Sequence, residues 1–264
     1  MVNVLIIGGS TSNESDTEKL AEILTTNSFF DDWAIVIVIH NLYPLVPNRQ
    51  SNHQNQGIRE IFGVKDNLIT LENFNPGELL QNNCIYILGS SDLSHPNDSV
   101  EFEVYEENGG IFITVENVNQ ISLESLNDSE NEQEPEEDLE ENWVTDFPEI
   151  NDFIHKFLEI ENIKKIKLAG VILAGLGNDG AEGLLRIKQE GGKTAVQNPE
   201  DCQRPGRGNG VNREMPEAAL ERLNRFNEEN NQNLAQHDLI TLRTQGTEEI
   251  PTFVEWFSSL NFNT

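Results

Sequence analysis

Short apolar runs bounded by polar turns recur along the chain. These runs are rich in valine and isoleucine and almost free of charge, which is typical of parallel strands buried on both faces. They are Val2–Ile7, Trp33–Ile39, Cys84–Leu88, Leu168–Ala174 and Lys193–Gln197, with Leu239–Leu242 as a last edge strand. Amphipathic stretches between them place apolar residues three and four positions apart, as helices do. The alternation predicts a doubly wound, mainly parallel sheet flanked by helices, a Rossmann-like α/β fold.

The helices are expected between and after these strands. One follows the first strand, with Asp16 or Thr17 as its N-cap. The others are Phe147–Leu158, a helix from Ala181, one that Met215 and Pro216 start and that runs through Leu223, and Phe253–Leu260. In addition, the segments on either side of the turn Glu106–Gly109 alternate or run apolar, which predicts a β-hairpin of Val100–Tyr105 and Gly110–Val115 at an edge of the sheet.

The loop after the Leu168–Ala174 run carries the first functional hypothesis. It reads Gly-Leu-Gly-Asn-Asp-Gly from residue 175 to residue 180, and glycines permit backbone angles and close approaches that a side chain would forbid. Asp179 is therefore expected at the carboxyl end of a buried strand, where open α/β sheets keep their sites. The structural alternative is that Asp179 or Asn178 only caps the helix that follows.

Two further reactive side chains follow other strands in the same way. Ser10 stands in the turn after the first strand, next to backbone N–H groups able to stabilise an oxyanion, although such turns often hold a hydroxyl residue without chemistry. His40 directly follows Trp33–Ile39. Ser10, His40 and Asp179 are thus expected in one layer, as the nucleophile, base and orienting acid of a triad. The remaining histidines are expected to be surface or packing residues: His53, His95, His155 and His237.

The net charge, the cysteine content and the absence of long apolar runs argue against some classes of partner and indicate a cellular compartment. The formal net charge of -29 repels polyanions, so neither nucleic acid nor an anionic membrane surface is an expected partner. The two cysteines, Cys84 and Cys202, lack metal-like spacing, which fits a reducing cytoplasm and argues against a structural zinc site. No apolar run approaches the roughly 20 residues of a membrane helix, and no signal peptide is recognisable, so a cytoplasmic protein is expected.

One segment departs sharply from the rest of the chain. Residues 122–142 contain ten acidic residues and no basic one, with few apolar side chains. Such a tract cannot bury enough surface to offset the entropy of ordering it, so we expect a disordered insert within a single catalytic domain that spans residues 1–264. It is expected to act as a solvated linker, and the functional alternative is a docking tail for a basic partner.

Several motifs, taken in order, resemble the catalytic domain of the chemotaxis protein-glutamate methylesterases. Gly9-Ser10-Thr11 resembles that family's nucleophile turn, and His40 matches the histidine that ends its second strand. Residues 175–184, GLGNDGAEGL, are close to a specific family signature around its aspartate. Weaker matches follow in the family's order: Pro76-Gly77 with Ile85-Tyr86-Ile87, then Gly191–Thr194, Gln197–Glu200 and Met215–Ala219.

The resemblance implies a carboxylic-ester hydrolase without metal or organic cofactor. Its expected substrates are glutamate γ-methyl esters on the cytoplasmic helices of chemoreceptors, with deamidation of receptor glutamine in some members. Ser10 would attack the ester, His40 would transfer the proton and Asp179 would orient the imidazole. The backbone N–H groups of Thr11 and Leu176 would hold the oxyanion, and Met215 and Pro216 would belong to substrate loops.

The chain departs from the family pattern in loops around this site. Ser12-Asn13 replace a usual Gly-Gly, Asn41-Leu42-Tyr43 replace a Met-Pro, and Arg207 to Glu214 separate two motifs that are nearly continuous in the family. The chain also begins at the first strand of the catalytic domain, so a fused receiver domain is not expected. The domain would then be constitutively active, regulated by chemosensory proteins in trans, or once part of a larger assembly.

Two other interpretations remain open. A weakly active or inactive relative would bind a partner as a regulatory module of a chemosensory system, and its function would survive Ser10→Ala. A flavin protein is the other, because Gly8–Asn13 followed by Thr17–Ala21 loosely resembles the phosphate loop of flavodoxin-like proteins. A yellow chromophore would identify the flavin protein.

Overall fold

The computed structural model describes residues 2–9, 14–39, 67–70, 77–89, 100–117, 150–161, 163, 166–175, 177–202, 213–247 and 249–260. Within these residues the main sheet has seven strands in the order β10-β9-β8-β1-β2-β5-β3, and every neighbouring pair is parallel. The strands are β1 (Val4–Gly9), β2 (Ala34–Ile39), β3 (Leu68–Thr70), β5 (Cys84–Gly89), β8 (Leu168–Ile172), β9 (Lys193–Gln197) and β10 (Asp238–Ile240). The predicted parallel, doubly wound sheet is confirmed.

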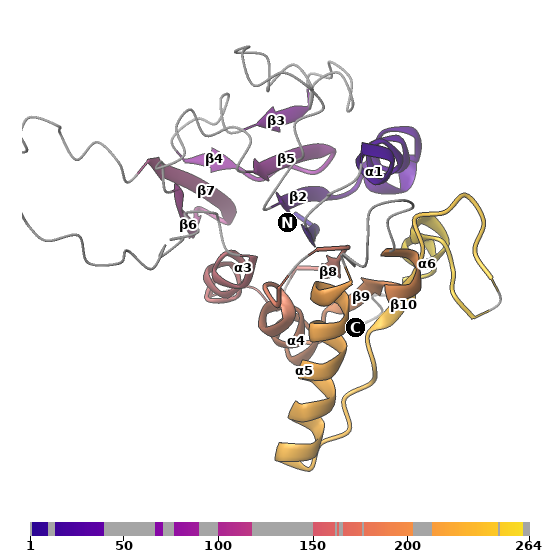
Figure 1. Cartoon of the computed structure of the whole chain (residues 1–264). Helices are drawn as coiled ribbons and strands as arrows, with labels where there is room; N and C mark the ends of the chain where they lie inside the picture. The colour runs from indigo at the N-terminus through magenta and orange to yellow at the C-terminus, as the bar shows by residue number, and fades with distance from the viewer. Residues whose placement is uncertain are drawn as a thin grey trace, which may run out of the picture.

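Helices cover both faces of this sheet (Figure 1). On one face lie α1 (Glu14–Thr26) and α6 (Phe253–Ser259), and on the other lie α3 (Ile150–Leu158), α4 (Ala181–Gln189) and α5 (Glu214–Asn230). The central strand, β1, contributes side chains to the core on each face of the sheet, because successive side chains of a strand point to opposite faces. Leu5 and Ile7 pack in the core under α1 and α6, whereas Val4 and Ile6 pack in the core under α3, α4 and α5. This double burial explains the uncharged strand sequence.

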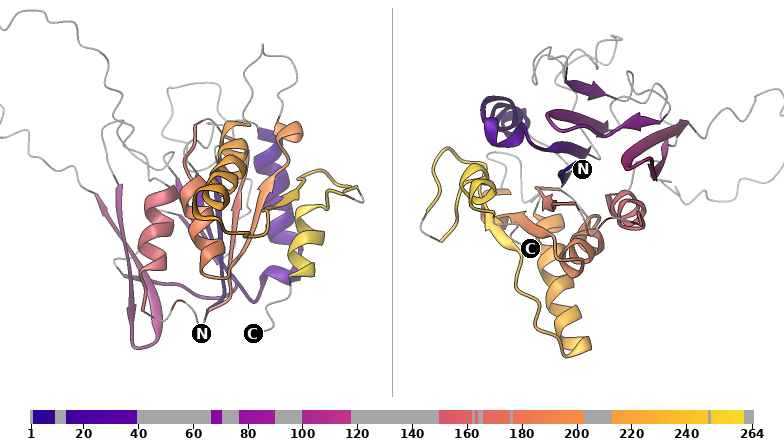
Figure 2. Two further views of the ribbon diagram at one scale, coloured as in Figure 1. Left: turned by 90° about the horizontal axis from the view of Figure 1, so that it is seen from below. Right: turned by 180° about the vertical axis from the view of Figure 1, so that it is seen from behind.

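The predicted hairpin is present, but its position differs from the expectation. β6 (Val100–Glu107) pairs with β7 (Gly110–Asn117), and β7 pairs with the short strand β4 (Glu78–Leu79) in a separate three-stranded antiparallel sheet. Asn108 and Gly109 both have positive φ, 51° and 78°, as the tight turn of a two-residue hairpin loop requires. This small sheet lies beside α3 rather than at the edge of the main sheet (Figures 1 and 2).

The side-chain pattern of the hairpin explains where it packs. Phe102 on β6 and Ile111 and Ile113 on β7 are buried on one face, and the ring of Phe102 meets that of Phe153 on α3 edge-on at 5.9 Å. A strand pair with a single apolar face can be covered by one helix, whereas a strand of the main sheet must be covered on two faces. The hairpin therefore packs on α3 and does not extend the sheet.

Two helix boundaries differ from the sequence prediction. α1 begins at Glu14, so Asp16 and Thr17 lie inside its first turn and neither is its N-cap. α5 continues seven residues past the predicted end at Leu223 and stops at Asn231, which has the left-handed conformation φ 49°, ψ 41°. The apolar pattern ends at Leu223 because the last turns of α5 leave the core, while polar residues still support a helix there.

One histidine is enclosed in the core, and its ring forms no ion pair with any of the described residues. His237 is 3% exposed, and its Nδ1 lies 2.8 Å from Thr194 Oγ1, while its buried Nε2 has no hydrogen-bond partner among the described residues. Burial, aided by nearby Lys188, lowers the pKa of His237 from 6.5 to about 3. Lys188 is itself close to Lys193 and Asp238, so the net local charge does not favour an imidazolium.

We expect His237 to make the protein less stable in acid. Its folded-state pKa lies below its unfolded-state pKa, so the unfolded chain binds more protons between about pH 6.5 and pH 3. The stability that the neutral ring gives is complete above pH 6.5 and falls by about 1.4 kcal/mol per unit as the pH drops through this window. Urea unfolding of the parent and His237→Gln at pH 7, 5.5 and 4 checks this. The stability advantage of the parent should shrink stepwise, and an advantage equal at all three pH values would contradict the assignment.

Candidate functional site

The central strands end side by side at the carboxyl edge of the sheet. Gly9 at the end of β1 is the register partner of Ile39 at the end of β2, and Gly8 is the register partner of Ile172 at the end of β8. Ser10 and His40 follow Gly9 and Ile39 directly in the sequence. Neighbouring strands of a sheet are about 4.8 Å apart, so the ends of β1 and β2 are close together. Ser10, Thr11, His40 and Leu176 themselves lie outside the described residues.

Asp179 is the member of the expected triad that the structure describes. Its Oδ2 accepts a hydrogen bond of 2.7 Å from Ile150 N, and its Oδ1 accepts bonds from Asn151 N at 2.9 Å and Gly180 N at 2.8 Å. The carboxylate thus caps α3, whose first backbone N–H groups have no partner within the helix. These bonds do not show the expected alternative, a cap on the following helix: the N-cap of α4 is Gly180, and the side chain that accepts from the first turn of α4 is Asn151, from Gly183 N at 2.7 Å.

Close packing brings this carboxylate to the end of β1. A Cβ atom on Gly8 would lie 2.7 Å from Ile150 Cγ2, so the glycine allows the first turn of α3 to press against the strand. Since Ile150 N also binds Asp179, the carboxylate lies near the strand that leads into Ser10. A carboxylate has about four acceptor positions, and the three N–H groups do not exhaust them. Capping α3 and orienting a histidine are therefore compatible roles.

Backbone conformation and close packing explain why glycine occupies two positions of this loop. Gly177 and Gly180 have φ of 85° and 84°, in the left-handed region that favours glycine. At Gly180 a Cβ would also collide with Ile172 Cδ1 at the end of β8. The sequence pattern around Asp179 is thus needed to fold the loop tightly over the strand end.

Three contacts hold the loop on either side of Leu176. The N–H of Ala174 donates to the buried Oε1 of Gln197 at 2.9 Å, and the carbonyl of Gly175 accepts from Met215 N at 3.1 Å. The N–H of Gly177 donates to Glu214 Oε2 at 2.8 Å. These bonds fix the backbone before and after residue 176, whose own N–H is a candidate oxyanion donor.

Sequence reasoning missed two of these supports. Gln197 and Glu214 received no role, although a glutamine at the end of an apolar strand was a visible signal of a buried polar contact. Met215 and Pro216 lie in the first turn of α5, which confirms the predicted helix start, and both are buried there; the resemblance also gives them a substrate-loop role. Met215 supports the glycine loop through its backbone N–H, and its side chain packs in the core.

Removing the Gln197 acceptor is expected to destabilise the protein. Gln197→Met keeps the length of the side chain but leaves the buried N–H of Ala174 without its acceptor, at a cost of about 1–3 kcal/mol. Gln189→Met, at an exposed position of α4, is the matched control and should stay within about 0.5 kcal/mol of the parent. Urea unfolding measures both, and equal stability of the two variants would show that this bond contributes little.

The described residues contain no group of three or more His, Cys, Asp or Glu side chains arranged to hold a metal ion. No helix in the described part of the chain is long and apolar enough to cross a membrane.

A parallel, doubly wound sheet with a glycine loop and a fixed carboxylate at its carboxyl edge defines an α/β domain of the kind that keeps its site at that edge. The family model described as CheB methylesterase matches residues 5–229, and the chain belongs to this family. The family resemblance seen in the sequence motifs is confirmed.

Individual relatives match less of the chain. A protein-glutamate methylesterase/protein-glutamine glutaminase 2 of Vibrio vulnificus is 44% identical over 57 residues, which cover 22% of this chain and 14% of that protein. The protein-glutamate methylesterase/protein-glutamine glutaminase of Bdellovibrio bacteriovorus is 58% identical over 33 residues, 12% of this chain and 9% of that protein. The matched segments thus span only a small part of these relatives.

A solved structure is similar over most of its length. The catalytic domain of the Thermotoga maritima CheB methylesterase aligns with a TM-score of 0.50 and 19% identity, covering 84% of this chain and 88% of that one. At this identity the similarity concerns the fold.

Proposed function

We propose that this protein is a serine hydrolase that cleaves glutamate γ-methyl esters on chemoreceptors to glutamate and methanol. The observation that carries the proposal is the register of the strand ends: Gly9 and Ile39, which precede Ser10 and His40 in the sequence, are partners on adjacent strands. The Asp179 carboxylate is fixed at the start of α3, where Ile150 packs against Gly8 of β1. Membership of the CheB methylesterase family supports the same reaction. The expected substrates are the cytoplasmic helices of chemoreceptors, so the reaction takes place in the cytoplasm.

The proposed chemistry uses only side chains and backbone of this chain. Ser10 Oγ attacks the ester carbonyl carbon while His40 accepts the hydroxyl proton, and the negative oxygen is held by the N–H groups of Thr11 and Leu176. The tetrahedral intermediate collapses, and methoxide leaves with the proton from His40 as methanol. Asp179 holds the imidazole in the required tautomer and stabilises its charged form.

The second half of the cycle restores the enzyme. Water gives a proton to His40 and attacks the acyl carbon, and the C–O bond to Ser10 breaks as the serine regains a proton. The products are the receptor glutamate and free Ser10. With a receptor glutamine the same steps release ammonia in place of methanol, which is the glutaminase reaction that the names of both relatives include.

The direct test is methanol release from methylated cytoplasmic fragments of a chemoreceptor. We expect methanol to appear in proportion to protein concentration, and none from unmethylated fragments. If the folded protein releases no methanol above the rate without enzyme, the hydrolase proposal fails. The chain would then be an inactive relative that binds a partner in a chemosensory system.

A further inference from the structure

The first turns of α3 and α4 are capped by residues outside each helix. The carboxylate of Asp179, which precedes α4, accepts from the N–H groups of Ile150 and Asn151 at the start of α3. In the opposite direction, Asn151 Oδ1 accepts from Gly183 N in the first turn of α4 at 2.7 Å. The starts of the two helices thus satisfy one another's unpaired N–H groups.

Asn151 supplies a cap that α4 does not have in its own sequence. The N-cap position of α4 is Gly180, which has no side chain to accept from the first turn. Gly180 has a φ of 84°, and a Cβ there would lie 2.4 Å from Ile172 Cδ1, so a serine, threonine or aspartate does not fit without strain. The acceptor therefore comes from another helix.

Glycines let the start of α3 approach both of its neighbours closely. A Cβ on Gly183 of α4 would lie 2.7 Å from Ile154 Cδ1. A Cβ on Gly8 of β1 would lie 2.7 Å from Ile150 Cγ2. The first turn of α3 is thus packed against α4 and β1, and a shift of this turn would also displace the Asp179 carboxylate that binds it.

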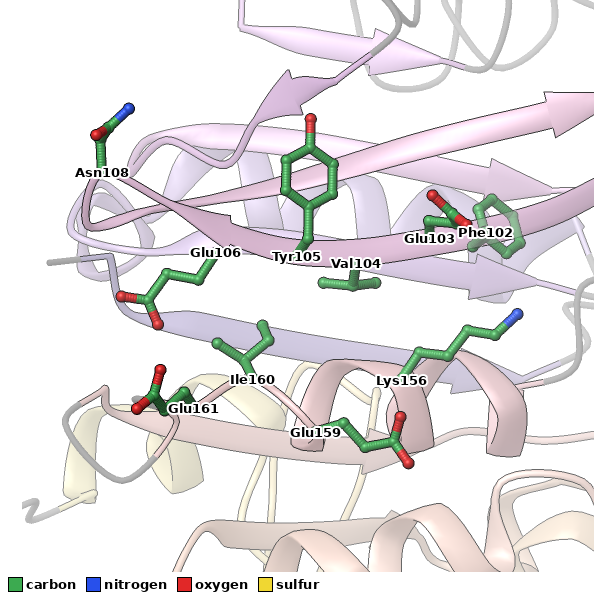
Figure 3. Close-up of a pocket in the computed structure, with 10 residues that line it drawn as sticks. All are labelled: Phe102, Glu103, Val104, Tyr105, Glu106, Asn108, Lys156, Glu159, Ile160 and Glu161. Atoms are coloured by element: carbon green, nitrogen blue, oxygen red, sulfur yellow. The ribbon is translucent and has the colours of Figure 1, made fainter.

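The other end of α3 is packed less closely. A hollow of about 660 Å³ separates the carboxyl end of α3 from β6, and Val104 and Ile160 point toward each other across it (Figure 3). The hairpin contacts the helix through the rings of Phe102 and Phe153, whose centroids are 5.9 Å apart. The position of the first turn therefore depends mainly on the contacts of that turn itself.

We propose that Asn151 is a positioning residue for the hydrolysis, which holds the Asp179 carboxylate in place by tying the start of α3 to the start of α4. This role depends on the proposed function, in which Asp179 orients the imidazole of His40. An orienting acid must stay within hydrogen-bond reach of the imidazole, and a displacement of about 1 Å can lower the rate by up to roughly 10²-fold. Asn151 acts through Asp179 and not on the reacting atoms.

Asn151→Ala removes the acceptor for Gly183 N and leaves every charged side chain in place. We expect kcat for methanol release to fall about tenfold with KM within about twofold, because the substrate still binds while the imidazole is held less well. The acid limb of the kcat/KM profile should move to lower pH by about half a unit, because a displaced carboxylate stabilises the imidazolium less. The control Asn227→Ala removes a similar acceptor, for Leu234 N at 2.9 Å, near the carboxyl end of α5. The control should lose stability in urea but keep the parent kcat and pH profile.

Amide hydrogen exchange, measured by NMR, tests the tie without any substrate. In Asn151→Ala the amides of Gly183 and Ile150 should both exchange about fivefold faster or more, the order expected when a cap is lost, and in Asn227→Ala both should keep the parent rate. Faster exchange at Gly183 alone would show that Asn151 only caps α4, and an unchanged kcat and pH profile in Asn151→Ala would also overturn the positioning role. If the parent releases no methanol, the hydrolase proposal fails, while the exchange of Ile150 still decides whether Asn151 holds the Asp179 carboxylate.

Discussion

Ser10→Ala is expected to reduce methanol release by about 10³-fold or more, the order of loss when a triad nucleophile is removed. Without the Oγ atom no covalent acyl intermediate can form, and the oxyanion donors alone retain only a residual rate. The change should leave the stability of the fold within about 0.5 kcal/mol, because it removes one small hydroxyl group from a residue that belongs to no strand or helix of the fold described.

Ser12→Ala is the matched control for this variant. It removes the same hydroxyl group two residues further along the same loop, and it should keep most of the methanol release. Methanol release by parent and variants is compared at equal protein concentration, with urea unfolding to show that all three are folded. Release that persists in Ser10→Ala would assign the nucleophile to another residue.

Asp179→Asn is expected to lower kcat/KM by roughly 10²- to 10⁴-fold, because an amide does not hold the imidazole in the productive tautomer. Stability should fall by about 1–2 kcal/mol, since the single amide oxygen can still accept from one of the N–H groups of Ile150 and Asn151, while the other loses its acceptor. Asp179→Ala should cost more stability, because it leaves the N–H groups of both Ile150 and Asn151 without their acceptor.

A variant at another helix cap distinguishes the catalytic role of Asp179 from its structural role as a cap. Thr252 caps α6 in a capping box with Glu255, and Thr252→Ala should cost about 1 kcal/mol of stability without loss of methanol release. Kinetics and urea unfolding are measured on all three variants. If Asp179→Asn loses stability but retains the parent rate, as Thr252→Ala is expected to do, Asp179 is a structural cap and not part of a triad.

Much of the fold could be predicted because its strands are buried on both faces. Lys193–Gln197 is a strand with the predicted bounds, and the run that ends at Ile39 begins one residue later than expected. The hairpin turn could be placed from Asn108 and Gly109, since few other residues adopt positive φ there. Where a sequence pattern depends only on local structure, as in these strands and this turn, the prediction is confirmed.

Features that depend on distant partners could not be predicted. Asp179 lies next to α4 in the sequence, and only the packing of Ile150 against Gly8 brings the start of α3 within its reach. The hairpin sequence did not reveal that β7 would pair with β4. Likewise, Gln197 and Glu214 support the glycine loop from segments that follow it by many residues. Such contacts are decided by the tertiary fold, not by local propensity.

β1, the central strand of the main sheet, is synthesised before the other strands of that sheet, but one of its two neighbours is synthesised much later. β1 has β2 on one side, but its other neighbour is β8, which begins at residue 168. Until β8 leaves the ribosome, a growing chain in which β1, β2 and β5 have paired keeps an open hydrogen-bonding edge, which is a template for aggregation. The ten acidic residues of 122–142 are translated during this interval. Their negative charge favours repulsion between nascent chains on neighbouring ribosomes during the time when the edge of β1 is not yet paired with β8.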